Sequence, residues 1–149
     1  MRILIQRVSS ASVSVKEKTV GAIDSGLVLF IGIEDADLKE DIDWLVQKIS
    51  NMRIFSDSEG KMNRSLLDQK GALLCISQFT LHAKTKKGNR PSFIKAAKPD
   101  FALNLYKEII SAFRKKDIIV EQGIFGEHME VILLNDGPVT IWMDSKNKE

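Results

Sequence analysis

The sequence predicts an α+β fold: one compact domain spanning residues 1–149, with a strongly bent, barrel-like, mostly antiparallel sheet and two main helices. Three observations support this prediction. Short runs of alternating or continuous apolar residues recur along the chain, two longer segments repeat apolar residues at helical spacing, and polar turns separate them. With 44% hydrophobic and 28% charged residues, the 149-residue chain suits a single soluble domain with a sizeable core.

The first third of the chain predicts strands. Residues 3–8 and 11–15 alternate between apolar and polar side chains, whereas residues 26–33 form a continuous apolar run, as in a strand buried on both faces. Arg7 continues the parity of Ile3 on the first strand. If that face is buried, the guanidinium points inward and needs acceptors such as main-chain carbonyls; the alternative is an exposed strand end.

Two helices follow from apolar periodicity. Asp37, three residues before Glu40, is expected to cap the first helix, whose other carboxylates are expected to face solvent. Pro99 opens the second helix, which ends near Arg114. Further strands are predicted at residues 52–55, 73–79, 118–120, 129–134 and 139–143, and a frayed tail at residues 145–149.

Composition excludes several classes of function. The net charge of +2 gives no global field, so any nucleic-acid contact must come from a local cluster of cations. The single cysteine, Cys75, lies in an apolar run and is expected to be a buried, inert thiol, which fits a reducing, cytoplasmic setting. No segment is long and apolar enough for a signal peptide or a membrane span. His82 and His128 lack partners at ligand spacing, so no metal site is expected.

The turn that contains Gly137 and Pro138 lies between two apolar runs near the end of the chain. An Asp-Gly pair between alternating hydrophobic residues is a strong hairpin signal. A Gly-Pro pair also offers bare carbonyls, and its peptide bond adopts the cis form at low cost. The residues alone leave two interpretations open, an ordinary hairpin or a rigid main-chain probe.

A second cluster, Ser77, Gln78, Phe79 and Thr80, places hydroxyl and amide groups at the end of an apolar strand. At such an end, backbone amides are free to bind a ligand oxygen. The alternative is a strand end with ordinary polar residues, since the sequence shows no base that would activate Thr80.

Between residues 84 and 90 the chain gathers cations around a glycine. A few phosphate contacts from such a loop would give salt-dependent affinity without reading bases, although a solvated lysine loop is the alternative. The cations are Lys84, Lys86, Lys87 and Arg90.

Taken together, three motifs closely resemble the D-aminoacyl-tRNA deacylase family, enzymes that remove D-amino acids mischarged on tRNA. They are residues 77–81 (SQFTL), 88–93 (GNRPSF) and 135–140 (NDGPVT), with weaker similarity at residues 5–8, 53–57 and 60–63. The resemblance spans essentially the whole chain. It implies hydrolysis of the ester bond of D-aminoacyl-tRNA, and of mischarged glycyl-tRNA, without a cofactor or membrane.

The resemblance also implies how substrates are selected. In this family the protein is a homodimer, and a cis Gly-Pro pair reaches into the active pocket of the partner subunit. Carried over, Gly137 and Pro138 would leave room for hydrogen and none for an L side chain, and Arg7 would orient them. Lys84, Lys86, Lys87 and Arg90 would meet acceptor-stem phosphates.

Two mechanisms for the hydrolysis remain open. Thr80 would act as the nucleophile, or it would hold the substrate while water attacks with help from the 2′-hydroxyl of the terminal adenosine. The second is favoured because an unactivated threonine is a weak nucleophile, and a backbone N–H near Phe79 and Thr80 would stabilise the oxyanion. Ser77 and Gln78 would shape the adenosine end of the pocket, with Met129 packing against the base.

Two other functions fit part of the sequence. A non-catalytic RNA-binding module would use the basic loop alone and ignore chirality. A hydrolase for small D-amino-acid esters or peptides would need no basic loop.

Overall fold

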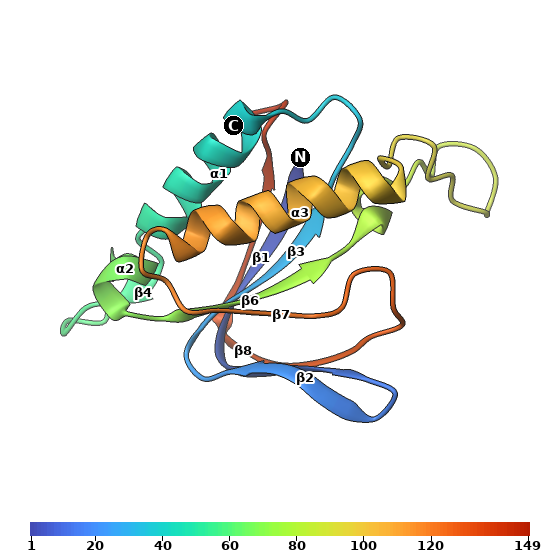
Figure 1. The fold of residues 1–149 in the computed structure, drawn as a ribbon. Coiled ribbons are helices and arrows are strands. Elements are labelled where there is room, and N and C mark those ends of the chain that lie inside the picture. Colours follow the sequence, from blue (N-terminus) through green and yellow to red (C-terminus); the bar gives the residue numbers. More distant parts are fainter.

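The computed structural model describes all residues from Met1 to Glu149. It confirms the predicted fold class: one domain in which two long helices cover one side of a strongly bent, nearly closed sheet (Figure 1). The sheet is mixed, because β3, β6 and β7 run parallel while all other pairs are antiparallel. The elements are β1 (Arg2–Val15), β2 (Lys18–Ile23), β3 (Gly26–Gly32), α1 (Lys39–Asn51), β4 (Phe55–Ser56), β5 (Met62–Arg64), α2 (Leu66–Gln69), β6 (Ala72–Ser77), the 3-10 turn η1 (Phe79–His82), α3 (Pro99–Arg114), β7 (Val120–Gln122) and β8 (Glu130–Asp144).

Strand β1 organises the sheet. The sequence predicts two strands here, but residues 2–15 form one bent strand. Its first half pairs with β3 and its second half with β2, while β8 pairs with almost its whole length on the other edge. Strands β2 and β7 approach closely enough that a Cβ on Gly21 would lie 3.0 Å from the carbonyl oxygen of Gln122. This approach nearly closes the barrel.

Both faces of the central strands are buried, which explains their continuous apolar sequence. The larger core lies between the sheet and helices α1 and α3, and it contains Leu29 and Leu73. The smaller core fills the inside of the bend, where Val28 and Leu74 point the opposite way. Strand β6 is therefore packed on both faces up to the point where the next segment, residues 77–80, begins.

Of the two interpretations of the turn at residues 135–138, the structure excludes the ordinary hairpin, and the prediction of two separate strands around it is wrong. Residues 130–144 form one strand, β8, which runs antiparallel to β1. In that pairing Gln6 lies opposite Thr140 and Val8 lies opposite Asn135, so the residues between them bulge out of the strand. The Gly137–Pro138 peptide bond is cis. The pair is therefore a protrusion from the middle of a strand.

The two ends of the chain meet beside α1 (Figure 1), and their contacts correct two expectations, the Asp37 cap and the frayed tail. Asp37 is buried and accepts hydrogen bonds from the Met1 amino group and the backbone of Glu34; it caps no helix. Helix α1 begins at Lys39, and the residue before it, Leu38, is the N-cap. The backbone N–H of Leu38 donates a hydrogen bond to the side chain of Asp41. The tail expected to fray is anchored at its first residue, because Ser145 is buried and its hydroxyl oxygen accepts a hydrogen bond from the Met1 amino group at 2.8 Å.

Asp41 is also buried rather than solvated. Burial would raise the pKa of its carboxyl group, but hydrogen bonds from Lys146, from Ser145 and from the backbone of Leu38 lower the pKa to about 2. The Nζ of Lys146 lies 2.6 Å from its Oδ2. A carboxyl group with a lowered pKa stabilises the fold above its ordinary titration range, and this stabilisation is lost as the pH falls towards 2.

Asp41→Asn should therefore destabilise the protein at pH 7 and have no effect near pH 2. The cost at pH 7 should not exceed about 2 kcal/mol, because Lys146 is partly exposed. Urea unfolding of both proteins between pH 7 and pH 2 measures the difference. Asp43→Asn, which breaks an exposed ion pair with Lys39 on the same helix, is the control and should stay within about 0.5 kcal/mol of wild type. A difference that persists at pH 2 would contradict this assignment.

Other boundaries differ from the sequence predictions in small ways. The strand expected at residues 52–55 is the short β4, Phe55–Ser56, and the one expected at 118–120 is β7, Val120–Gln122. The strand expected to reach Phe79 ends at Ser77, and η1 begins two residues later. Strands β2 and β5 were not predicted, and neither were α2 and η1, which are single turns of four residues each. Turns this short carry no apolar periodicity that a sequence window could detect.

Candidate functional site

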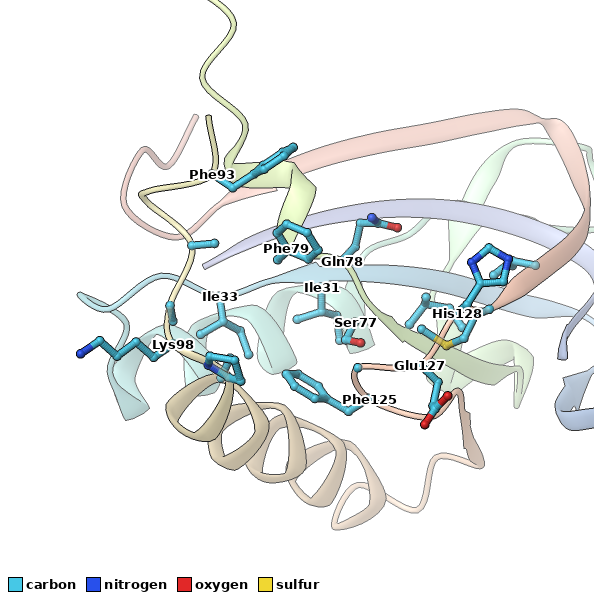
Figure 2. A pocket seen from close by; sticks show the side chains of 18 residues that line it. Ile31, Ile33, Ser77, Gln78, Phe79, Phe93, Lys98, Phe125, Glu127 and His128 are labelled. Carbon is cyan, nitrogen blue, oxygen red and sulfur yellow. The ribbon is translucent and has the colours of Figure 1, made fainter. Parts of the chain in front are cut away.

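A cavity of about 690 Å³ opens between the end of β6, the start of α3 and the loop before β8 (Figure 2). Its floor is apolar, with Ile31 and Ile33 from the end of β3 and the residue that follows it. Most of its lining is hydrophobic, and polar groups stand at its rim. The lining residues are Ile31, Ile33, Ile76, Ser77, Gln78, Phe79, Phe93, Ala96, Ala97, Lys98, Pro99, Ala102, Phe125, Gly126, Glu127, His128, Met129 and Val131.

The predicted cluster at residues 77–80 forms one wall of this cavity. Ser77 ends β6, Gln78 adopts an irregular conformation, and η1 then turns the chain away from the sheet. Ser77, Gln78 and Phe79 line the cavity, whereas Thr80 does not. The hydroxyl oxygen of Thr80 accepts a hydrogen bond of 2.6 Å from the side-chain amide of Gln78. At the start of a helical turn the first backbone N–H groups have no partner within the turn, so this wall can offer main-chain donors.

The loop before β8 forms the opposite wall of the cavity, and the sequence predicted only one of its lining residues. Met129 lines the cavity, as the sequence analysis expected, but so do Phe125, Glu127 and His128 from the loop before it. Met129 packs against Gly123, where this loop leaves β7, and a Cβ on Gly123 would force the Met129 side chain to move, because it would lie 2.3 Å from the sulfur. The glycines at 123 and 126 were the only sequence signal of a shaped loop, since none of its side chains is unusual in type.

The beginning of α3 forms the third wall. Lys98, Pro99 and Ala102 line the cavity there, and the apolar periodicity of the helix gave no sign of this. Burial of Leu105 and Ile109 holds the rest of the helix on the sheet. One helix therefore serves both the core and the cavity, a division that periodicity alone cannot reveal.

The cation-rich loop, residues 84–92, projects from the domain (Figure 1), and the residue that follows it, Phe93, lines the cavity. Lys84 and Ser92 form an antiparallel bridge at its base, with backbone hydrogen bonds of 2.8 and 3.1 Å. Beyond this bridge Lys86, Lys87 and Arg90 are all exposed. The loop therefore presents its positive charge to solvent close to the rim of the cavity.

Gly137 and Pro138 do not line the cavity of their own chain, and both are exposed. Arg7, by contrast, is buried, as its strand parity predicts. Its Nε donates to the carbonyl oxygen of Asp136 at 3.2 Å and pairs with the Asp136 carboxylate at 3.1 Å, and its Nη1 donates to the carbonyl of Ile54. The main-chain acceptors expected for Arg7 are thus confirmed. Through Asp136, Arg7 also holds the residue that precedes the Gly137–Pro138 protrusion.

Side chains on the strand also hold the protrusion. The Oδ1 of Asn135 accepts a hydrogen bond from the backbone of Val139 at 3.0 Å, which closes the loop across its base. The amide nitrogen of Asn135 donates to the hydroxyl of Thr140 at 3.0 Å. The Gly137–Pro138 pair is therefore braced by Asn135 and Arg7 together, although the sequence analysis named only the arginine.

The remaining reactive side chains lie outside the cavity. Cys75 is buried, and burial raises the pKa of its thiol to about 12, which confirms the predicted inert cysteine. His82 ends η1 and is buried with both ring nitrogens unpaired. Burial lowers the pKa of His82, so its ring is neutral at pH 7. No group of three or more histidine, cysteine or acidic side chains comes together as metal ligands would.

The arrangement defines an α+β domain with an apolar slot, main-chain and amide donors at one wall, and a cationic loop at the rim. The family model described as D-Tyr-tRNA(Tyr) deacylase matches residues 4–144. A protein of Flavobacterium johnsoniae named D-aminoacyl-tRNA deacylase is 57% identical, with both chains covered completely. One of Bacillus pumilus with the same name is 54% identical, covering 98% of this chain and 99% of the relative.

Solved structures agree on the fold. One described as c-Myc DNA Unwinding Element Binding Protein superposes with a TM-score of 0.91 at 36% identity, covering 97% of this chain and 98% of the other. Another, a probable eukaryotic D-amino acid tRNA deacylase, has a TM-score of 0.80 at 20% identity, covering 95% and 97%. The chain belongs to the D-Tyr-tRNA(Tyr) deacylase family. None of its helices has the length and hydropathy needed to cross a membrane.

Proposed function

We propose that this protein hydrolyses the ester bond of D-aminoacyl-tRNA and releases the free D-amino acid. The observation that carries the proposal is the cavity, which combines an apolar slot with the Ser77 to Phe79 wall and has the exposed cationic loop directly before its lining residue Phe93. The 3′ end of a charged tRNA has the matching parts: a planar base, an ester and a chain of phosphates. Family membership and the names of the relatives point to the same substrate.

Within the cavity, the terminal adenosine would occupy the apolar slot. Met129 and Phe125 would pack against the base from one wall, while Ser77 and Gln78 would bind it or its ribose from the other. The ester would then lie near Phe79 and Thr80, where the first N–H groups of η1 would stabilise the oxyanion. One such donor contributes roughly 3 to 4 kcal/mol to catalysis in other hydrolases.

Selection against L-amino acids would come from Gly137 and Pro138 of a second subunit. Their main-chain atoms protrude from β8, are fixed by Arg7 and Asn135, and meet nothing in the cavity of their own chain. Facing the Cα of the substrate, they would leave space for hydrogen but not for an L side chain. Because the screen is steric and consists of main chain, D residues of many kinds and glycine should pass, so mischarged glycyl-tRNA would also be cleaved.

The surface of β8 supports a homodimer. Its outer edge pairs with no strand of the same chain, although the strand is 15 residues long. Ile132, Leu134 and Trp142 expose 73%, 63% and 48% of their area on this strand. Long free edges with large apolar side chains are normally covered in native proteins. A second copy would cover this one and bring the Gly137–Pro138 protrusion to the neighbouring molecule.

Thr80 would position the substrate while water, assisted by the 2′-hydroxyl of the adenosine, attacks the ester. The Thr80 hydroxyl accepts its hydrogen bond from an amide N–H of Gln78, which cannot take up the proton that an attacking hydroxyl must lose.

Thr80→Ala should therefore keep the single-turnover deacylation rate of D-Tyr-tRNA within about tenfold of wild type, since positioning by one hydroxyl is worth little more. Rapid-quench measurement with enzyme in excess gives this rate directly. A loss of a thousandfold or more, together with a covalent Thr80 adduct in the wild type, would contradict the proposal. Thr85→Ala in the projecting loop is the matched control and should match wild type.

The cationic loop would hold the phosphates of the acceptor stem. A Lys86→Ala, Lys87→Ala double variant should bind all tRNAs roughly tenfold more weakly, and its plot of log affinity against log salt should flatten by about 1.5. Filter binding between 50 and 300 mM salt measures both quantities. The control removes two exposed lysines from the helices, Lys48 and Lys107, with the same change in net charge. Equal effects in both double variants would show that only the net charge matters.

One assay distinguishes the proposed activity from its alternatives. The hydrolysis rates of D-Tyr-tRNA, L-Tyr-tRNA and a free D-Tyr ester are compared at equal concentration. We expect efficient cleavage of D-Tyr-tRNA alone. Binding of both tRNAs without cleavage would indicate an RNA-binding module, and rapid cleavage of the free ester would indicate a small-ester hydrolase.

A further inference from the structure

Two aromatic rings stand at the rim of the cavity on the side of the cationic loop. Phe79 exposes 57% of its area, which is unusual for a phenylalanine at a well-ordered turn. Phe93 meets it edge to face, with ring centroids 5.1 Å apart and planes at 77° (Figure 2). Both rings line the cavity, but neither belongs to a core cluster.

The position of this aromatic pair, Phe79 and Phe93, follows from the base of the loop. The bridge between Lys84 and Ser92 closes the loop, and Phe93 is the next residue on the cavity side of it. The exposed cations lie on the far side of the same bridge. A chain that runs from the cavity to the cations must therefore pass the aromatic pair.

We propose that the aromatic pair stacks the nucleotide that precedes the terminal adenosine of the substrate. This inference rests on the proposed function, in which the adenosine fills the cavity. A single-stranded nucleic acid is bound by combining a cationic track for its phosphates with aromatic rings for its bases, and the rim offers both side by side. The pair thus makes a second subsite, for a base rather than for the ester.

The charge around the pair favours a nucleotide over a second protein chain. Lys98 lines the same cavity as the pair, and Lys84 lies across the bridge from Ser92. The apolar surface that a second copy of the chain would cover lies elsewhere, on the free edge of β8, with Ile132, Leu134 and Trp142. Cations beside exposed rings match a polyanion with planar bases.

The test uses short acceptor-stem helices charged with a D-amino acid, either intact or with an abasic nucleotide before the terminal adenosine. For the wild-type enzyme, the abasic substrate should raise KM by roughly fivefold to a hundredfold, the range for loss of one stacked base, with kcat within about twofold. Phe93→Ala should show the same loss with the intact substrate and no further loss with the abasic one. Phe93→Tyr should restore the difference in KM between the intact and the abasic substrate.

Phe93 is chosen because its backbone lies outside the catalytic turn, whereas changes at Phe79 would disturb the oxyanion donors. Ile94→Ala, which removes the exposed apolar neighbour, is the control and should behave as wild type. A D-aminoacyl ester of adenosine alone should be cleaved equally well by the wild type and Phe93→Ala, because it lacks the second base.

Three results would overturn the inference. They are equal KM for the intact and abasic substrates in the wild type, an equal loss by Phe93→Ala on the adenosine ester, or a shift of Phe93→Ala from dimer to monomer in sedimentation. The last would make the pair part of a subunit interface. If the wild type cleaves neither substrate, the proposed function itself fails, and this outcome is distinct from cleavage that ignores the missing base.

Discussion

Gly137→Ala should lower the single-turnover rate of D-aminoacyl-tRNA deacylation at least about a hundredfold, the usual cost of a displacement of about 1 Å in a positioning group. At this position φ is +121°, which L side chains rarely adopt. A Cβ would lie 2.8 Å from Nη2 of Arg7 and 2.9 Å from a methyl group of Val139. The methyl group would therefore push the protrusion off its support, and the ratio of D to L cleavage rates should fall as well.

The control for this variant is Gly60→Ala. Gly60 also has a positive φ, of +80°, but a Cβ there meets nothing within 4 Å. It lies between β4 and β5, away from the cavity, so the substitution carries a similar backbone strain without touching the protrusion. Its deacylation rate should equal that of the wild type. If Gly137→Ala retains a rate within threefold of wild type while folded and dimeric, the protrusion does not shape the site.

Mixing two inactive variants should restore about a quarter of the wild-type activity. One variant, Gly137→Ala, has an intact cavity and a damaged protrusion. The other, Ala96→Trp, fills the cavity from its rim and leaves the protrusion intact. In the proposed homodimer, random pairing would make half of the dimers mixed, and each mixed dimer would have one complete site out of two, which gives about one quarter.

The measurement refolds or co-expresses the two variants together and compares the specific activity with that of each variant alone. A mixture of wild type and Ala96→Trp is the control, because its specific activity measures how far a subunit with a blocked cavity lowers the activity of the mixture. Recovery near one quarter means that the protrusion of one subunit completes the cavity of the other. No recovery, with mixed dimers shown to form by native mass spectrometry, would mean that each chain builds its site alone.

Local sequence patterns determined much of the fold. The continuous apolar run at residues 26–33 gave a strand buried on both faces, and Pro99 marked the start of α3 to the residue. In both cases the signal is local: a strand or helix with buried faces must show apolar residues at its own period. The strand parity of Arg7 left burial and an exposed strand end open; the structure shows the buried alternative, with the carbonyl acceptors expected for it.

The errors arose where partners distant in sequence override local preference. Asp37 looks like a helix cap, yet it pairs with the amino group of Met1. The tail looks frayed, yet Lys146 bonds to Asp41, and Lys148 lies 4.8 Å from the ring centre of Trp44. The Asn-Asp-Gly-Pro turn reads as a hairpin, but pairing with β1 on both sides of it joins the flanking runs into one strand. No short window of sequence contains those partners.

The sequence by itself determined the family, through three motifs at residues 77–81, 88–93 and 135–140, and it determined which side chains are available for chemistry. Only the tertiary structure decided where they act. It brought Ser77, Phe93 and Met129 around one cavity, and it set Gly137 and Pro138 outside that cavity, exposed on β8. The physical reason is that a cavity is a gap between packed elements, so its shape depends on strand register and helix position. Those are fixed by burial across the whole domain.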